Sequence, residues 1–89
     1  MYSLFLSAQA QKFLITCEPQ IKHQLEELFG ILIEDPLPIP RYDIAKIRGL
    51  KKGYRVRLGT IRVIIELNPR VQEIYILKID KRSKAYRDL

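Results

Sequence analysis

The sequence is poor in the residues that build metal sites and covalent catalytic sites. Its 89 residues include one cysteine, one histidine and no tryptophan. Cys17 alone cannot form an internal disulfide, which favours a reducing compartment. One cysteine and one histidine cannot form a Cys/His zinc cluster, and a Ser-His-Asp or Cys-His site would need His23 as its base. We therefore expect no metal site and no cofactor.

Long apolar runs are also missing. Runs such as Ile31–Ile33 are far shorter than the about 20 residues that a membrane span needs. The N-terminal segment lacks the basic region and the long apolar core of a signal peptide. We therefore expect a soluble, cytoplasmic protein. A chain of this length, with 47% hydrophobic residues, has room for one domain, residues 1–89, and is too short for a Rossmann or TIM-barrel enzyme.

Positive charge is concentrated in the second half of the chain. Residues 1–40 carry two basic and five acidic side chains, a net charge of −3, whereas residues 41–89 carry 14 basic and five acidic ones, a net charge of +9. Such asymmetry indicates either a polyanionic partner, such as nucleic acid, or a basic surface that maintains solubility. Composition alone leaves both explanations open.

The first half of the chain predicts one strand and two helices. Tyr2–Leu6 is a short apolar run typical of a strand, and Ser7 is a suitable N-cap for a helix that follows it. Four apolar residues of this first helix fall at helical spacing: Ala10, Phe13, Leu14 and Cys17. A second helix over roughly Pro19–Glu34 has a similar apolar face, with His23 on the polar face, which argues against a catalytic role for that histidine. The alternating prolines of Asp35–Pro40 predict an extended connector rather than a proline-rich ligand.

The second half predicts strands. Tyr54–Leu58 and Ile61–Leu67 alternate polar and apolar residues on either side of Gly59–Thr60, which indicates a hairpin with a type II′ turn. Ile44–Leu50 is a further candidate strand. Val71–Ile79 has apolar residues at both parities, which predicts a central strand covered on both faces.

Three arginines of the hairpin share one face of the predicted sheet. The two-residue turn sets Arg57 opposite Arg62 and Arg55 opposite Ile64, while the alternate residues face the core. Like charges directly opposite each other are unfavourable by up to about 1 kcal/mol. Glu66 on the same face is expected to neutralise one of these arginines at most. Because a guanidinium binds phosphate in a bidentate manner, we interpret the cluster as a polyanion site; a solvated face with paired arginines is the alternative.

The polar tail, residues 80–89, is expected to form one or two helical turns. Arg82 and Tyr86 are four residues apart and would share one helical face. If the preceding strand lies beside the hairpin, both are close to the arginines, where a tyrosine can stack on a base or transfer a proton. An aromatic anchor packed against the sheet is the alternative.

The order and spacing of these segments resemble the RelE/ParE superfamily of toxins from toxin–antitoxin systems. The resemblance covers essentially the whole chain and is most specific over Ile47–Glu66, with its run Tyr-Arg-Val-Arg-Leu-Gly-Thr-Ile-Arg, and over Leu77–Tyr86, with Leu-Lys-Ile-Asp-Lys-Arg. It implies an α+β fold in the order β-α-α-β-β-β(-α). Two N-terminal helices would pack on one face of a small antiparallel sheet that is mixed at one edge.

The resemblance also implies an activity. RelE-type members are mRNA interferases that cleave messenger RNA in the ribosomal A site, by attack of a 2′-hydroxyl on the adjacent phosphate to leave a 2′,3′-cyclic phosphate. By motif position, the expected catalytic residues are Arg55, Arg57, Arg62, Arg82 and Tyr86. The basic residues expected to contact RNA are Arg48, Lys51, Lys52, Lys81 and Lys84. Some members carry lysines where this chain has Arg55 and Arg57. Because arginine stays protonated and is a poor general base or acid, we expect Arg55, Arg57 and Arg62 to bind the scissile phosphate and its developing charge.

The expected partners are a cognate antitoxin protein and mRNA on the ribosome, with no membrane. Two alternative functions share the fold. A ParE-like toxin would inhibit DNA gyrase without cleaving RNA, and the basic set with Tyr86 favours the RNase over it. A non-catalytic member would bind RNA in a salt-sensitive manner and leave it intact.

Overall fold

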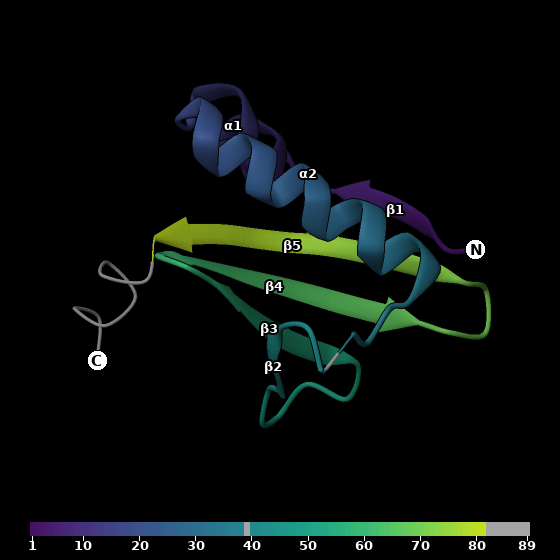
Figure 1. Ribbon diagram of the computed structural model, residues 1–89. Helices are drawn as coiled ribbons and strands as arrows, with labels where there is room; N and C mark the ends of the chain where they lie inside the picture. The colour runs from purple at the N-terminus through teal and green to yellow at the C-terminus, as the bar shows by residue number, and fades with distance from the viewer. Residues whose placement is uncertain (39, 82–89) are drawn as a thin grey trace.

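The protein folds into a five-stranded sheet with two helices, in a computed structural model that describes residues 1–38 and 40–81 (Figure 1). The helices are α1 (Ala8–Thr16) and α2 (Pro19–Glu34). The strands are β1 (Ser3–Leu6), β2 (Asp43–Lys46), β3 (Gly53–Leu58), β4 (Ile61–Asn68) and β5 (Glu73–Lys81). They lie in the order β1-β5-β4-β3-β2, with β1 parallel to β5 and the other neighbours antiparallel. The predicted α+β fold, with a sheet mixed at one edge, is confirmed.

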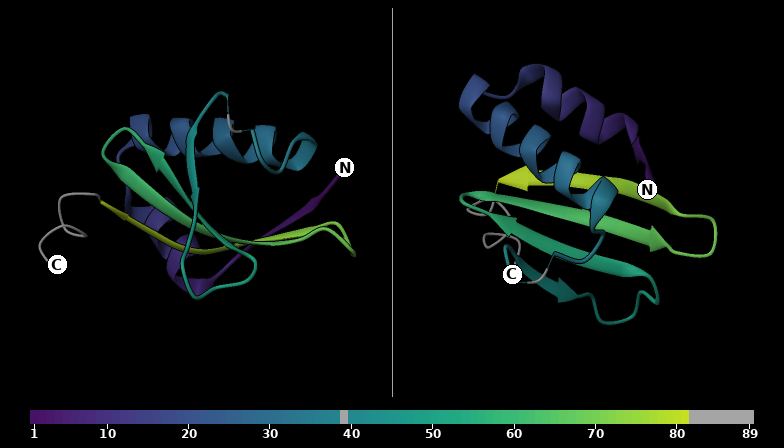
Figure 2. Two further views of the ribbon diagram at one scale, coloured as in Figure 1. Left: turned by 90° about the horizontal axis from the view of Figure 1, so that it is seen from below. Right: turned by 45° about the vertical axis from the view of Figure 1, so that its right-hand side comes forward.

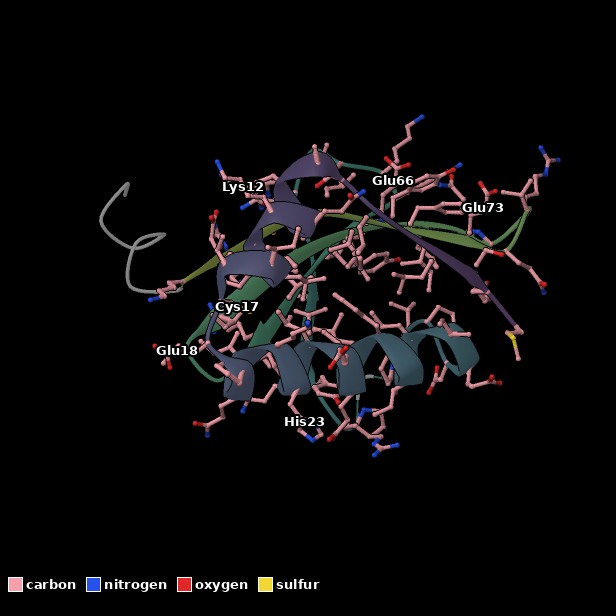
Figure 3. All side chains as sticks on the ribbon, turned by 90° about the horizontal axis from the view of Figure 1, so that it is seen from above. Lys12, Cys17, Glu18, His23, Glu66 and Glu73 are labelled. Carbon is pink, nitrogen blue, oxygen red and sulfur yellow. The ribbon has the colours of Figure 1, made fainter. Side chains whose placement is uncertain are left out.

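Local sequence sets where both helices begin. The Ser7 hydroxyl accepts a hydrogen bond from the Ala10 N–H at 3.1 Å, which is the predicted N-cap of α1. Pro19 lies in the first turn of α2, where its missing N–H costs no helical hydrogen bond. His23 is exposed on the outer side of α2 (Figure 3). Neither helix in the described part of the chain has the length and apolar character of a membrane span.

The core lies between the helices and one face of the sheet, with α2 along that face (Figure 2). α2 contributes four buried side chains, Leu25, Leu28, Phe29 and Leu32. The sheet contributes Val56, Ile61, Val63, Ile65, Leu67, Ile74, Ile76 and Ile79. From α1, Ala10 joins the same cluster, with Phe13 and Leu14 packed against it. The opposite face, which we call the polar face, carries the hairpin arginines.

The β3–β4 hairpin has the predicted register. Arg57 pairs with Arg62, and Arg55 with Ile64. Gly59, the first residue of the turn, has a φ of 59°, the sign that a type II′ turn requires there. The candidate strand Ile44–Leu50 is shorter than predicted: β2 ends at Lys46, and the chain then turns through Gly49, whose φ of 91° favours glycine.

A β-bulge explains the mixed parity of the apolar residues in β5. The pairing with β4 shifts between Ile64 and Ile65, which leaves Leu77 as an extra residue in β5. The side chains therefore change parity there, so that Ile79 is buried in the core while Lys78 is exposed on the polar face. The interpretation of a strand covered on both faces is wrong, because a single bulge produces the same pattern.

α1 covers the part of β5 that extends beyond β1. The Ser7 hydroxyl donates to the Leu77 carbonyl at 2.8 Å. The Gln9 amide donates to the Ile79 carbonyl at 2.8 Å and accepts from the Ile79 N–H at 2.9 Å. Gln9 thus makes the two bonds that a neighbouring strand would make, and protects an edge that could otherwise pair with another chain.

Candidate polyanion-binding site

The polar face has a basic end where the three hairpin arginines lie together. In one row across the sheet, Arg57 pairs with Arg62, and these two are flanked by Asp43 of β2 and Asp80 of β5. Arg55 lies on the same face one row further along β3. All three arginines are half-buried. The alternation of the hairpin therefore brings three permanent positive charges together on a rigid surface.

Asp43 makes the ion pairs with the arginines of this basic end, whereas Asp80, on the other side of Arg62, pairs with Lys78 at 3.2 Å. Arg57 Nη1 lies 3.4 Å from Asp43 Oδ2, and Arg55 Nη2 lies 3.9 Å from Asp43 Oδ1. One carboxylate thus neutralises two arginines only in part. Glu66, the expected partner, instead accepts a hydrogen bond from Asn68 Nδ2 at 3.1 Å. Asp43 takes this place because β2 brings it directly beside Arg57, whereas Glu66 lies in a different row of the sheet.

A cavity of about 370 Å³, which we call the basic cavity, opens at this end of the sheet. Its lining residues are Lys46, Ile47, Arg48, Arg55, Arg62 and Ile64. The Nε atoms of Arg55 and Arg62 are buried and have no hydrogen-bond partner among residues 1–38 and 40–81. A buried donor without a partner costs about 1–3 kcal/mol. The basic cavity is therefore suited to a ligand that brings several anionic oxygen atoms.

The side chains of the basic cavity can bind and stabilise negative charge but are poor at moving protons. Arginine stays protonated near neutral pH, and its fork matches two phosphate oxygens at once. Guanidinium groups held in place can also stabilise the additional charge of a phosphorane. Among the described lining residues, Lys46 is the one exception, because an amine can exchange a proton. In the part of the chain that the structure describes, no three His, Cys, Asp or Glu side chains are grouped to hold a metal.

The other end of the polar face is acidic, and its groups bond to one another. The Tyr75 hydroxyl donates to Glu73 Oε1 at 2.7 Å, and Phe5 of β1 stacks on the Tyr75 ring with centroids 5.2 Å apart. Glu66 and Glu73 lie on the side of the sheet away from α2 (Figure 3). The hydrogen bond to Glu73, desolvation, and the charges of Glu73 and Glu66 raise the pKa of Tyr75. Tyr75 therefore holds its proton and is unsuited to act as a base.

The residues expected to contact RNA are distributed over several places. Arg48 lines the basic cavity, and Lys51 and Lys52 line a cavity beside it. Lys81 ends β5 and lines a separate cavity next to α1 and α2. Three predicted site residues lie outside the described residues: Arg82, Lys84 and Tyr86. Helical turns were expected over residues 80–89. Residues 80–81 instead belong to β5, and the rest of that segment lies outside the described residues.

Sequence reasoning missed Asp43 and Lys46. The candidate strand began one residue too late to include Asp43; a strand one residue longer would have placed it opposite Arg57. Lys46 pairs with Tyr54, whose side chain packs against the core, so alternation gave no reason to assign Lys46 to the polar face. Lys46 lines the basic cavity at the point where β2 ends. Asp43 thus follows only once the pairing of β2 with β3 is known, and for Lys46 even that pairing gives no signal.

Solved structures share this fold. The chain matches a crystal structure of the archaeal RelE–RelB complex from Pyrococcus horikoshii with a TM-score of 0.84 and 30% identity, over 93% of this chain and 97% of that chain. It matches the isolated E. coli RelE toxin with a TM-score of 0.75 and 21% identity, over 99% of this chain and 94% of that chain. The arrangement of helices and strands is therefore that of RelE toxin structures.

Sequence similarity points to the same group of proteins. A Methanocaldococcus jannaschii protein assigned as toxin RelE1 is 33% identical over 72 residues, which cover 79% of this chain and 78% of that protein. No family model matches the sequence. Identity at this level over most of both chains, together with the shared fold, shows that the chain belongs to the RelE toxin family. The predicted superfamily is confirmed.

Proposed function

We propose that the protein is the toxin of a type II toxin–antitoxin system and acts as an mRNA interferase, an endoribonuclease that cleaves messenger RNA in the ribosomal A site. The observation that carries this proposal is the basic cavity, where buried Nε atoms of Arg55 and Arg62 have no partner among the described residues. A phosphodiester brings the anionic oxygens that these donors lack. Membership of the RelE toxin family supports the same activity.

In the proposed reaction, the 2′-hydroxyl of one nucleotide attacks the adjacent phosphate. The O2′–P bond forms and the P–O5′ bond breaks, which leaves a 2′,3′-cyclic phosphate and a free 5′-hydroxyl. Arg55 and Arg62 bind the non-bridging oxygens and stabilise the charge that develops on the phosphorane. Arg57, which lies in the same row as Arg62 and is held by Asp43, adds positive potential.

The proton steps need groups other than the arginines. The 2′-hydroxyl loses a proton and the leaving 5′-oxygen gains one, and the arginines supply neither function well. We assign to the tail the groups around these steps: Tyr86 stacks on a base or takes the proton of the 2′-hydroxyl, and Arg82 neutralises the leaving oxygen, which then takes a proton from water.

The proposed protein partner is an acidic antitoxin. Neighbours of this fold were crystallised as RelE–RelB complexes from Pyrococcus horikoshii and Methanococcus jannaschii, which supports a partner of that kind. The net charge of +9 on residues 41–89 favours an acidic segment. Such a segment laid over Arg55, Arg57 and Arg62 would block RNA and remove their mutual repulsion. The product of the adjacent gene is expected to bind the protein and restore growth; a product that does neither contradicts this part of the proposal.

Primer extension on translated messages tests the cleavage activity. Expression of the wild type is expected to produce new RNA 5′ ends inside coding sequences. Arg62→Ala is expected to reduce their formation roughly 100- to 1,000-fold, as for other lost donors to a transition-state anion. Arg70→Ala is the matched control, because Arg70 is an exposed arginine in the β4–β5 turn. Cleavage by Arg62→Ala at the wild-type level, or gyrase-dependent DNA damage without cleavage, contradicts the proposal.

A further inference from the structure

A second cavity lies beside the basic cavity on the polar face. It has a volume of about 330 Å³, and we call it the side cavity. Its lining residues are Leu50, Lys51, Lys52, Gly53, Glu66, Asn68 and Leu77. The two leucines give it apolar walls, although both remain partly exposed, at 48% for Leu50 and 39% for Leu77. Exposed leucines around a cavity on an otherwise polar face indicate a surface that an apolar group can cover.

The fold holds both leucines in place. Leu77 is the extra residue of the β5 bulge, a device that re-aims a side chain near functional sites. Leu50 lies so close to the backbone of Gly53 that a Cβ added there would be 2.9 Å from Leu50 Cβ. Only glycine at this position leaves room for Leu50. The apolar walls thus depend on two local features, a bulge and a close backbone approach.

A chain of hydrogen bonds forms the polar side of the side cavity. Lys52 Nζ donates to Asn68 Oδ1 at 3.1 Å, and Asn68 Nδ2 donates to Glu66 Oε2 at 3.1 Å. These bonds orient the Asn68 amide, because its oxygen faces the ammonium and its nitrogen faces the carboxylate. Within residues 1–38 and 40–81, Glu66 Oε1 has no hydrogen-bond partner. The side cavity therefore combines apolar walls with one anionic acceptor, which suits a flat ring that carries a donor on its edge.

The two cavities are one step apart along the strands. On β4, Ile64 lines the basic cavity and Glu66, two residues further on, lines the side cavity. On β3, Arg55 lines the basic cavity and Gly53 lines the side cavity. Two residues of a strand span about 7 Å. This is of the order of the length of one nucleotide. A phosphate bound in the basic cavity would therefore bring an adjacent base to the side cavity.

We propose that the side cavity binds a nucleobase of the RNA and selects bases with an exocyclic amino group over uracil. The proposal rests on the proposed function, because the phosphate in the basic cavity delivers the base. The base ring packs against Leu50 and Leu77, and its amino group donates to Glu66 Oε1. Carboxylates accept hydrogen bonds from the cytosine amino group in this way. Uracil presents a carbonyl oxygen at the same ring position, which repels the carboxylate.

Hexamers of cytidine and uridine are matched probes, because their bases differ at ring position 4, where cytosine carries the amino group and uracil the carbonyl oxygen. Fluorescence anisotropy at low salt is expected to show that the wild type binds the cytidine hexamer about ten-fold more tightly, as for a hydrogen bond to a charged acceptor. In Glu66→Gln, the side-chain oxygen is expected to accept from Asn68, which leaves the NH₂ group toward the base. The preference is then expected to disappear or to reverse toward uridine.

Glu73→Gln is the matched control, because it removes a carboxylate from the same face but outside both cavities. Both variants remove one negative charge from this face, but only Glu66→Gln is expected to change the ratio of the two affinities. Equal binding of the two hexamers by the wild type, or the same ratio in both variants, overturns the base site. Arg62→Ala is expected to weaken binding of both hexamers and keep their ratio. Binding that is unaffected by Arg62→Ala overturns the phosphate site, and the base site with it.

Discussion

The two ends of the polar face are built on the same strands but differ in how far their polar groups are satisfied. At the acidic end, Glu73 and Tyr75 share a hydrogen bond, and Phe5 stacks on the tyrosine. At the basic end, one carboxylate faces two arginines, and the Nε atoms of Arg55 and Arg62 have no partner in the described part of the chain. Glu73 and Tyr75 thus satisfy each other within the protein, whereas the basic end is suited to be completed by a ligand.

Whether the polar groups of a cluster have hydrogen-bond partners distinguishes a stabilising cluster from a binding site better than the sign of its charge does. Residue type alone would assign binding to either end, since acidic patches also attract partners. Unsatisfied buried donors are rare in folded proteins, because each one costs free energy of folding. Two of them lie on adjacent strands of one hairpin, at the site where we propose that an anion binds.

Apart from Arg62→Ala, the largest effect on cleavage is expected from the exchange of the same arginine for lysine. Arg62→Lys keeps the positive charge but loses Nε and the bidentate fork. Cleavage in a reconstituted translation system is expected to slow about ten-fold, the loss of one hydrogen bond to a charged group. The free energy of unfolding is expected to stay the same or to rise, because the exchange removes an unpaired buried donor. Full activity of this variant would mean that charge, and not the fork, defines the basic end.

The hairpin and both helix starts could be predicted because short-range chemistry determines them. Gly59 and Thr60 form a two-residue turn that fixes which arginines face each other. Ser7 and Pro19 mark helix starts through their own hydrogen-bonding properties. For the same reason, the grouping of the three arginines follows from the residues of the hairpin alone.

The features that alternation could not reveal depend on contacts between distant segments. The bulge at Leu77 exists only in the pairing of β5 with β4, and in the sequence it imitates a strand covered on both sides. Asp43 reaches Arg57 because the connector after α2 delivers β2 to the outer edge of the hairpin. Both depend on which strands become neighbours, which periodicity within one strand does not encode.

Removal of the acidic partner at the basic end is expected to have a smaller effect, in the opposite direction. Asp43→Asn frees Arg55 and Arg57 from their ion pairs. Affinity for single-stranded RNA is expected to rise about two- to five-fold, the range that half-exposed ion pairs allow, with a steeper salt dependence. Asp35→Asn is the control, because Asp35 is an exposed residue at the end of α2. Equal gains in the two variants would indicate net charge alone and remove the special role of Asp43.

The smallest effect is expected on the stability of the protein at alkaline pH, and it arises from Tyr75 at the acidic end. The hydrogen bond to Glu73 is the main cause that raises the pKa of Tyr75 above its ordinary value of 10.0. The folded state therefore holds this proton more tightly than the unfolded state, so the stabilisation is full below the unfolded pKa and is lost as the pH rises through the folded one. Glu73→Gln is expected to lower the Tyr75 pKa, followed by NMR of the tyrosine Cζ signals, and to reduce this alkaline loss of stability. An unchanged Tyr75 titration in Glu73→Gln would show that the acidic end is not held together by this bond, and the contrast with the basic end would then rest on the arginines alone.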